Sequence, residues 1–470
     1  MPYQGEIANK ASHSDIVRNP DVAAFLKGCT YLREPSAEEA QTISARFQVI
    51  PPTDGTELPN YVIAVDGSFY EASITERLPS TRIGFIKIGA VLIDMAQYKS
   101  LRVGPFVDPF RVAELQRNNS PLTFAVPSAN IRTNGKASVR DSFRAAVDEQ
   151  LVGPRTRFNP EDGRSSLRTT LFHLAARRAG PLATGDSTRL RLHACPNPEC
   201  SNGPIELMDV PEQQFCPYCN AEVYPSDCLR VWEEVTDFQS NATALSRLML
   251  VIEHMLPMHY LRFLLENSPQ VLGSTAFFVD GPLAIFGNGA WLHGGILRYF
   301  AEVNAQLEQR GLPRIIMIGL QKTGQVVDHI KLIDRYVQPG RIFAIDDDFR
   351  YQFILMGGRE PAENGFGSGT YYGQDFIYKT PSGRIFCMAL PYPVASKTEF
   401  GESFKTTKTQ LSHYVELPRA LALIDHFESD LYENAVIPIA LAHRYTAISL
   451  QPGGKVLDLL TRRALAQIGT

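Results

Sequence analysis

Two apolar runs, each ending in Asp-Gly, most constrain how this chain can fold. YVIAVDGS begins at Tyr61 and carries Asp66 at its end, and STAFFVDG carries Asp280 at its end. Both runs have the length and the β-branched and aromatic content of buried strands. After the second run, helical and strand-like segments alternate: a helix over 295–309, the strand RIIMIGLQK, the helix VVDHIKLIDRY and the strand RIFAIDDD. This order predicts an α/β fold with a mixed sheet flanked by helices.

The same periodicities assign the other segments. We expect helices near 22–27, 37–47 and 241–266, two strands in RIGFIKIGAVLIDM as an antiparallel extension of the first strand, and a hairpin in DFIYKTPSGRIFCMALP that turns at TPSG. The last 50 residues are expected to be mainly helical. The predicted division is a helical N-terminal lead-in (1–60), the first part of the core (61–137), a basic helical insertion (138–190), a cysteine-rich segment (191–230) and the second part of the core (231–470).

Charge and hydropathy limit the kinds of partner. The formal net charge is -4, so the chain lacks the broad basic field of small DNA-binding proteins, and a nucleic acid would need a local basic channel or a partner protein. The most basic stretch carries Arg155, Arg157, Arg164, Arg168, Arg177 and Arg178. Such a helix is usually a solvated face, and DNA contact is the alternative. No uninterrupted apolar run reaches the roughly 18 to 20 residues of a spanning helix, so we expect a soluble, cytoplasmic protein without membrane contact.

Five of the seven cysteines fall within 34 positions, which favours metal binding in a reducing compartment over disulfides. Four of them form the pairs Cys195-x4-Cys200 and Cys216-x2-Cys219, with 15 residues between the pairs. This spacing predicts an inserted zinc ribbon, in which four thiolates leave no open coordination position and the zinc is structural. His193 and Cys228 are nearby substitutes for one of the four. The alternative is unligated cysteines in a reducing cytosol.

The two Asp-Gly sites suggest metal chemistry when they are taken together. Alone, a strand-terminal Asp-Gly is most often a turn. Two strand ends in one sheet can instead bring carboxylates together around one or two Mg²⁺ or Mn²⁺ ions, which phosphodiester hydrolysis by in-line attack requires. Carboxylates that share such ions should lie within roughly 4 to 6 Å of one another.

Five segments then occur in the order found in NurA nucleases, which this chain resembles from about 60 to 470: AVDGS, FFVDGPL, IGLQKTG, MALPYP and PIALAHRYTAIS. The resemblance implies an RNase H-like core. It also implies a metal site with an aspartate from the first strand, a glutamate from a helix, an aspartate from a later strand and a histidine from a C-terminal helix. Asp66 and Asp280 match the two aspartates, and His443 matches the histidine.

Two further site residues follow from the same resemblance. Lys322 matches a lysine that could hold the scissile phosphate or its developing charge. Glu253 in RLMLVIEHMLP fits the helical glutamate, and Glu266 is the alternative. Where the family tends to place a tyrosine before the histidine, this chain has Asn434, with Tyr432 close by, so no tyrosine role is carried over. The zinc ribbon is an insertion that simpler family members lack.

The resemblance implies a Mn²⁺- or Mg²⁺-dependent deoxyribonuclease that processes DNA ends with a HerA-type hexameric ATPase, in DNA repair or antiviral defence, and that forms a homodimer. One alternative is a catalytically silent NurA-like subunit that acts as a DNA clamp or assembly platform. Another is a zinc-ribbon adaptor for nucleic acids without chemistry, which would leave Asp66, Asp280 and His443 unexplained.

An acidic run and a glycine-rich segment resemble functional motifs, but we assign no function to them. Asp346, Asp347 and Asp348 are interpreted as a solvated strand end and helix cap. The glycine-rich segment 365–370 has no Walker lysine and is interpreted as a flexible loop.

Overall fold

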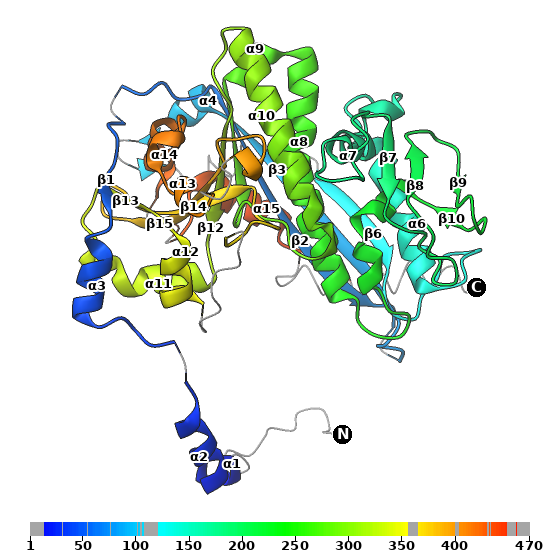
Figure 1. Ribbon diagram of the computed structural model, residues 1–470, viewed down its shortest axis with the longest axis horizontal. Helices are drawn as coiled ribbons and strands as arrows, with labels where there is room; N and C mark the ends of the chain where they lie inside the picture. The colour runs from blue at the N-terminus through cyan, green and yellow to red at the C-terminus, as the bar shows by residue number, and fades with distance from the viewer. Residues whose placement is uncertain are drawn as a thin grey trace.

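A sheet of nine strands runs through the protein, in the order β1-β13-β14-β15-β12-β11-β2-β3-β6 (Figure 1). The computed structural model describes residues 14–30, 32–53, 55–75, 77–100, 102–103, 106–107, 121–355, 365–399, 404–429, 432, 434–448 and 457. The strands are β1 (Gln48–Val49), β2 (Tyr61–Ser73), β3 (Arg82–Asp94), β6 (Leu122–Pro127), β11 (Thr275–Asp280), β12 (Ile316–Gln321), β13 (Arg341–Ala344), β14 (Gly373–Lys379) and β15 (Ile385–Pro391).

The three central strands, β2, β11 and β12, run parallel to one another, and the strands on both sides of them pair antiparallel. The mixed α/β sheet is therefore confirmed, and so is the hairpin, whose strands are β14 and β15. In the register, Val279 pairs with Val65 across β11 and β2. Neighbouring strands lie about 4.8 Å apart, so the aspartates that follow these two valines are brought side by side.

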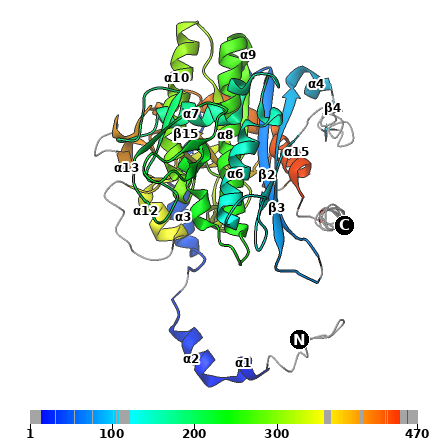
Figure 2. The ribbon, with the colours of Figure 1, turned by 90° about the vertical axis from the view of Figure 1, so that its right-hand side faces the viewer.

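Helices cover both faces of the sheet (Figures 1 and 2). One face packs against α6 (Val139–Val152), α7 (Leu167–Ala176), α8 (Ala242–Asn267) and α10 (Leu292–Gln309), and, nearer the β1 edge, against α3 (Ala37–Ser44) and α11 (Gln325–Ile333). The other face packs against α4 (Met95–Ser100), α14 (Leu417–Phe427) and α15 (Ile437–Thr446). Side chains alternate between the faces along β2, where Ile63 and Val65 face α8 while Val62 and Ala64 face α15.

The helices expected near 22–27 and 37–47 are confirmed as α2 (Pro20–Gly28) and α3. The preceding α1 (Ser14–Arg18) and α2 bury no residue and extend away from the body in both views (Figures 1 and 2). Two of the helices expected in the last 50 residues are α14 and α15, and residues 449–456 and 458–470 lie outside the described residues.

α8 is long and apolar enough to cross a membrane by length and composition alone. Its most apolar window, however, is 72% buried inside the protein. Its buried residues include Leu245, Leu248 and Ile252, which belong to the cluster beneath the sheet. α8 is therefore a core helix of an α/β protein.

β3 corrects one prediction and, with it, the position of Asp66. RIGFIKIGAVLID forms one continuous strand rather than two, the following Met95 begins α4, and the strand pairs with β2 from Tyr61 to Ser73. Asp66 consequently lies inside β2, not at its end, because β3 offers it an unbroken ladder. Asp280 does end β11, and Gly281 follows with a φ of 90°, a left-handed turn conformation that glycine adopts without strain.

The acidic run after β13 also differs from its prediction. Asp346 caps α12 (Asp347–Phe349) and Asp348 is exposed, as expected. Asp347 is instead buried, 2.6 Å from Lys408 Nζ, and it accepts a hydrogen bond from the Phe366 backbone. The prediction of a solvated run is therefore wrong for Asp347, whose counter-ion lies far along the chain.

The interpretations of the glycine-rich segment and of the basic stretch also change, because residues elsewhere in the chain contact them. The glycine-rich segment is held in place, because Lys397 Nζ donates hydrogen bonds to the carbonyls of Gly367 and Ser368 at 3.0 and 2.6 Å. Within the basic stretch, Arg168 forms buried ion pairs with Asp148 and Asp209. At least this arginine joins helices inside the protein and does not lie on a solvated face.

Candidate active site and cysteine cluster

Asp66 and Asp280 lie side by side on the face of the sheet that α15 covers. The side chain of Asp66 is 4% exposed and that of Asp280 is 20% exposed. One carboxylate oxygen of each and one ring nitrogen of His443 all lie within 4.8 Å of one another. The separation expected for two carboxylates that share metal ions is thus confirmed. The backbone N–H of Gly67 donates to Asp66 Oδ1 at 2.7 Å and orients that carboxylate.

α15 brings His443 to the two aspartates. The Nδ1 atom of His443 lies 2.8 Å from Asp66 Oδ2, and this hydrogen bond raises the pKa of His443. The imidazole is 52% exposed. Its ring can therefore reach a bound ion or a proton acceptor at the surface while Asp66 holds its orientation.

Lys322 follows β12 and supplies the positive charge of the site. Its Nζ atom lies 2.7 Å from Asp280 Oδ2 and 3.7 Å from Asp66 Oδ2. Because β11 and β12 are adjacent parallel strands, a side chain just beyond β12 reaches the carboxylate that ends β11. The structure thus brings together Asp66, Asp280, Lys322 and His443 from three strands and one helix.

Glu253 approaches the same cluster from α8. Its side chain is buried, with 4% of the residue exposed. Four residues later Pro257 lacks the N–H that would bond to the Glu253 carbonyl, so the helix adapts locally at this position. Burial raises the pKa of Glu253 well above its ordinary value, and the nearby charges of Asp66 and Asp280 raise it further. Glu266 is exposed and lies 13 residues further along, about 20 Å at 1.5 Å per residue. Of the two glutamates, Glu253 is the one whose pKa the two aspartates raise, but its carboxylate is not among the ligand atoms that lie within 4.8 Å of one another.

The charges of this cluster fit a divalent cation. Burial and then repulsion from Asp66 raise the pKa of Asp280 to about 6, although Lys322 opposes the rise. In the part of the chain that the structure describes, no hydrogen bond or ion pair reaches the Glu253 carboxylate. Three carboxylates therefore face one ammonium group, and a buried carboxylate without a partner is costly unless a cation compensates it. Carboxylate and imidazole ligands of this kind suit Mn²⁺ and, for the oxygens, Mg²⁺.

Tyr372 is a neighbour of this site that sequence analysis did not single out. Its fully buried side chain has a pKa raised well above the ordinary value, first by burial and then by the charge of Glu253. Its hydroxyl lies 2.6 Å from His254 Nδ1. Nothing in the glycine-rich segment before it indicates this contact, because it joins residues 118 positions apart.

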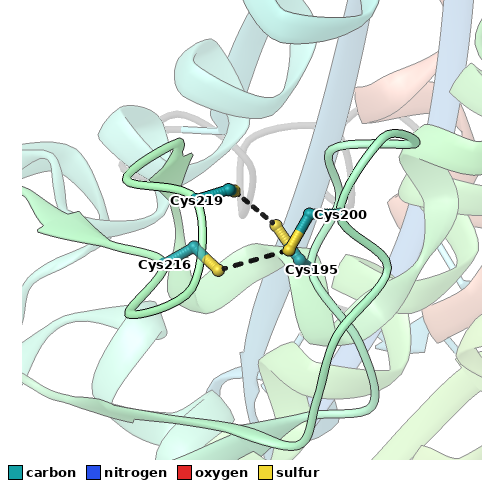
Figure 3. Close-up of side chains that lie close together, drawn as sticks. All are labelled: Cys195, Cys200, Cys216 and Cys219. Carbon is teal, nitrogen blue, oxygen red and sulfur yellow. Dashed lines mark hydrogen bonds between the residues drawn. The ribbon is translucent and has the colours of Figure 1, made fainter.

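The cysteine cluster has the geometry of a tetrahedral metal site. The sulfurs of Cys195, Cys200, Cys216 and Cys219 lie within 4.8 Å of one another and point inward from two facing turns (Figure 3). Cys195 and Cys219 are 3.7 Å apart, and Cys200 and Cys216 are 3.9 Å apart. Four thiolates at 2.3 Å from one zinc ion would stand about 3.8 Å apart, so the four residues fit zinc. His193 and Cys228 are not in this cluster.

A family model described as the NurA domain matches residues 61–448. This chain belongs to the NurA family. As a NurA-domain protein it is associated with nuclease activity and DNA substrates, which implies the use of a divalent metal ion.

Among curated proteins, none matches this NurA-family chain. A solved structure titled "Crystal structure of NurA" aligns over 97% of this chain and 97% of its own, with 11% sequence identity and a TM-score of 0.25.

Proposed function

We propose that this NurA-family protein hydrolyses DNA phosphodiester bonds with Mn²⁺ or Mg²⁺ held by Asp66, Asp280, Glu253 and His443. The observation that carries the proposal is the convergence of Asp66, Asp280 and His443 within 4.8 Å, and the buried Glu253, whose pKa the charges of Asp66 and Asp280 raise, supports it. A purely structural ion pair would not need three carboxylates around one lysine.

The roles of the residues follow from their positions. A bound ion would supply Lewis-acid activation of water and of the phosphate. Asp66 and Asp280 bind and orient from the rigid sheet, and Glu253 adds a third carboxylate from below. His443 either completes the ligand set or moves a proton at its exposed ring. Lys322, held at Asp280, stabilises negative charge on the phosphate.

Several finer features belong to the same proposal. An RNase H-like core is supported by the order β6-β3-β2-β11-β12, in which a three-strand antiparallel unit is followed by two strands parallel to β2. Structural zinc on the four cysteines is supported by their spacing. A cytoplasmic location, a homodimer, a HerA-type ATPase partner and a role in DNA end processing for repair or antiviral defence rest on the family resemblance.

Cleavage of labelled linear DNA with Mn²⁺, with and without a HerA-type ATPase, tests the proposal. Asp66→Asn or Asp280→Asn should lower cleavage by several orders of magnitude while DNA binding persists. Asp348→Asn is the matched control, since it removes an exposed carboxylate outside the site. Variants that cut like the wild type would refute the nuclease assignment. A wild type that never cuts, under any metal or partner condition, would point to the silent platform.

A further inference from the structure

The last turn of α15 is tied to β2 and β3 close to the candidate metal site. Ser68 Oγ donates a hydrogen bond to the Thr446 carbonyl at 2.5 Å and accepts one from the Ile448 backbone at 3.2 Å. Lys87 Nζ donates to the Tyr445 carbonyl at 2.5 Å. Ser68 and Lys87 are direct cross-strand partners, so the two side chains hold neighbouring carbonyls from adjacent positions of one sheet.

These contacts satisfy groups that a helix end leaves open. The final carbonyls of an α-helix have no partner within the helix, and a cation beside them is favoured by the helix dipole. Lys87 is such a cation, and its ammonium also lies 5.1 Å from the centre of the Tyr445 ring. The end of α15 is therefore fixed by specific donors from the sheet and not only by apolar packing.

Gly89 allows the helix to approach this closely. It is the cross-strand partner of Asp66. A Cβ atom at Gly89 would lie 2.6 Å from Thr446 Cγ2 and 2.7 Å from Tyr445 Cδ1, which is closer than real contacts allow. The last turn of α15 thus rests directly on the backbone opposite Asp66, and His443 lies three residues before Thr446.

We propose that Ser68 and Lys87 are positioning residues that set the distance and orientation of His443 relative to Asp66, and that Gly89 leaves the space that α15 needs. This inference rests on the proposed function, because the distance and orientation that these residues set belong to the proposed metal site. The imidazole is 52% exposed and hydrogen-bonds Asp66, so the distance between the two groups depends on where the helix places the backbone of His443. Groups that hydrogen-bond a metal ligand commonly change metal affinity by 10- to 100-fold when they are removed. Ser68 and Lys87 act on His443 through the backbone of α15, so a loss at the lower end of this range is expected.

Two measurements on the full chain test this without relying on cleavage. The first is Mn²⁺ affinity by titration in the absence of DNA, for Ser68→Ala and Lys87→Met. Both variants should bind Mn²⁺ about 10-fold more weakly, and the conservative Lys87→Arg should recover part of the loss. The second is the ¹⁵N-histidine NMR signal of His443, assigned with His443→Ala. Its hydrogen-bonded Nδ1 signature should weaken in both variants even without metal.

Gln150→Ala is the matched control for stability. Gln150 also joins a helix to a strand by two hydrogen bonds, to the Ala125 backbone at 2.7 and 2.8 Å, but at the outer strand β6. The Gln150→Ala variant should have a lower melting temperature but the same Mn²⁺ affinity and the same His443 signal as the wild type. The proposal is overturned if Ser68→Ala and Lys87→Met lower the melting temperature as Gln150→Ala does but leave both readouts unchanged. If the wild type binds no Mn²⁺, the proposed function fails, while the NMR signal still decides whether these residues position His443.

Discussion

Replacing Asp280 with asparagine should stabilise the metal-free protein while it abolishes cleavage. Burial and Asp66 raise the pKa of Asp280 from the ordinary 3.8 to about 6. A shift of about 2 units corresponds to about 3 kcal/mol against the ionised form, at 1.36 kcal/mol per unit. The opposing effect of Lys322 is already contained in this shift. Asparagine keeps the shape of the side chain without its charge, so at pH 7.5 the variant should gain up to about 3 kcal/mol.

The pH dependence fixes the sign of this effect. Because the pKa of Asp280 is raised in the folded state, the free energy of unfolding of the wild type falls as the pH rises from about 4 to about 6. Above that range the whole destabilisation by ionised Asp280 is present. The variant has no carboxyl group to titrate there. Its advantage should therefore be largest at pH 7.5 and should disappear near pH 4.

Thermal unfolding measures the difference. At about 2.1 cal/mol/K per residue, the unfolding entropy of a 470-residue chain is about 1 kcal/mol/K. A gain of about 3 kcal/mol therefore corresponds to a rise of about 3 °C in the melting temperature. The buffer should lack Mn²⁺ and Mg²⁺ but contain no chelator, so that the zinc proposed for the four cysteines is not removed. Adding Mn²⁺ should raise the melting temperature of the wild type more than that of the variant. A metal-free Asp280→Asn protein that melts below the wild type at pH 7.5 would refute the argument from repulsion.

Three further predictions follow from other contacts. Replacing Cys216 and Cys219 with serine should release about one zinc ion per chain and increase proteolysis of residues 190–230, while a folded, soluble variant still cleaves DNA; loss of cleavage in such a protein would contradict a purely structural zinc. Asp347→Asn leaves Lys408 buried without its counter-ion and should cost about 3 to 5 kcal/mol in denaturant unfolding, whereas Asp348→Asn should change little; equal effects would be the contrary result. Lys322→Met removes the only cation found on Asp66 and Asp280 in the described residues apart from His443. It should lower the melting temperature without metal and increase the gain on adding Mn²⁺, and an unchanged gain would argue against charge compensation.

The parts of the site that sequence predicts are those encoded by local pattern. Asp66 and Asp280 each lie in an apolar run with the composition of a strand, so local pattern predicts that two strands carry them. Lys322 is matched through the order of the family's segments. The cysteine pairs are likewise visible as short spacings. Family order, rather than periodicity, supplied His443, because a histidine in a short helix has no pattern of its own.

The parts that sequence does not predict depend on partners far along the chain. Asp347 resembles its exposed neighbour Asp348, and only Lys408, 61 residues later, distinguishes it. Glu253 and Glu266 lie on the same helix, and the sheet beneath α8 decides which one faces the aspartates. The length of β2 depends on β3, whose continuous pairing places Asp66 inside a strand.

The hydrogen bond between Asp66 and His443 joins residues 377 positions apart, and this separation has a consequence for synthesis. During translation, the strands that carry both aspartates and the lysine leave the ribosome long before α15 does. Contacts of such long range form late, after the intervening chain has become available. A growing chain would therefore carry no complete metal centre before α15 had been made, and a nuclease assembled this way would stay inert beside nucleic acids until that point.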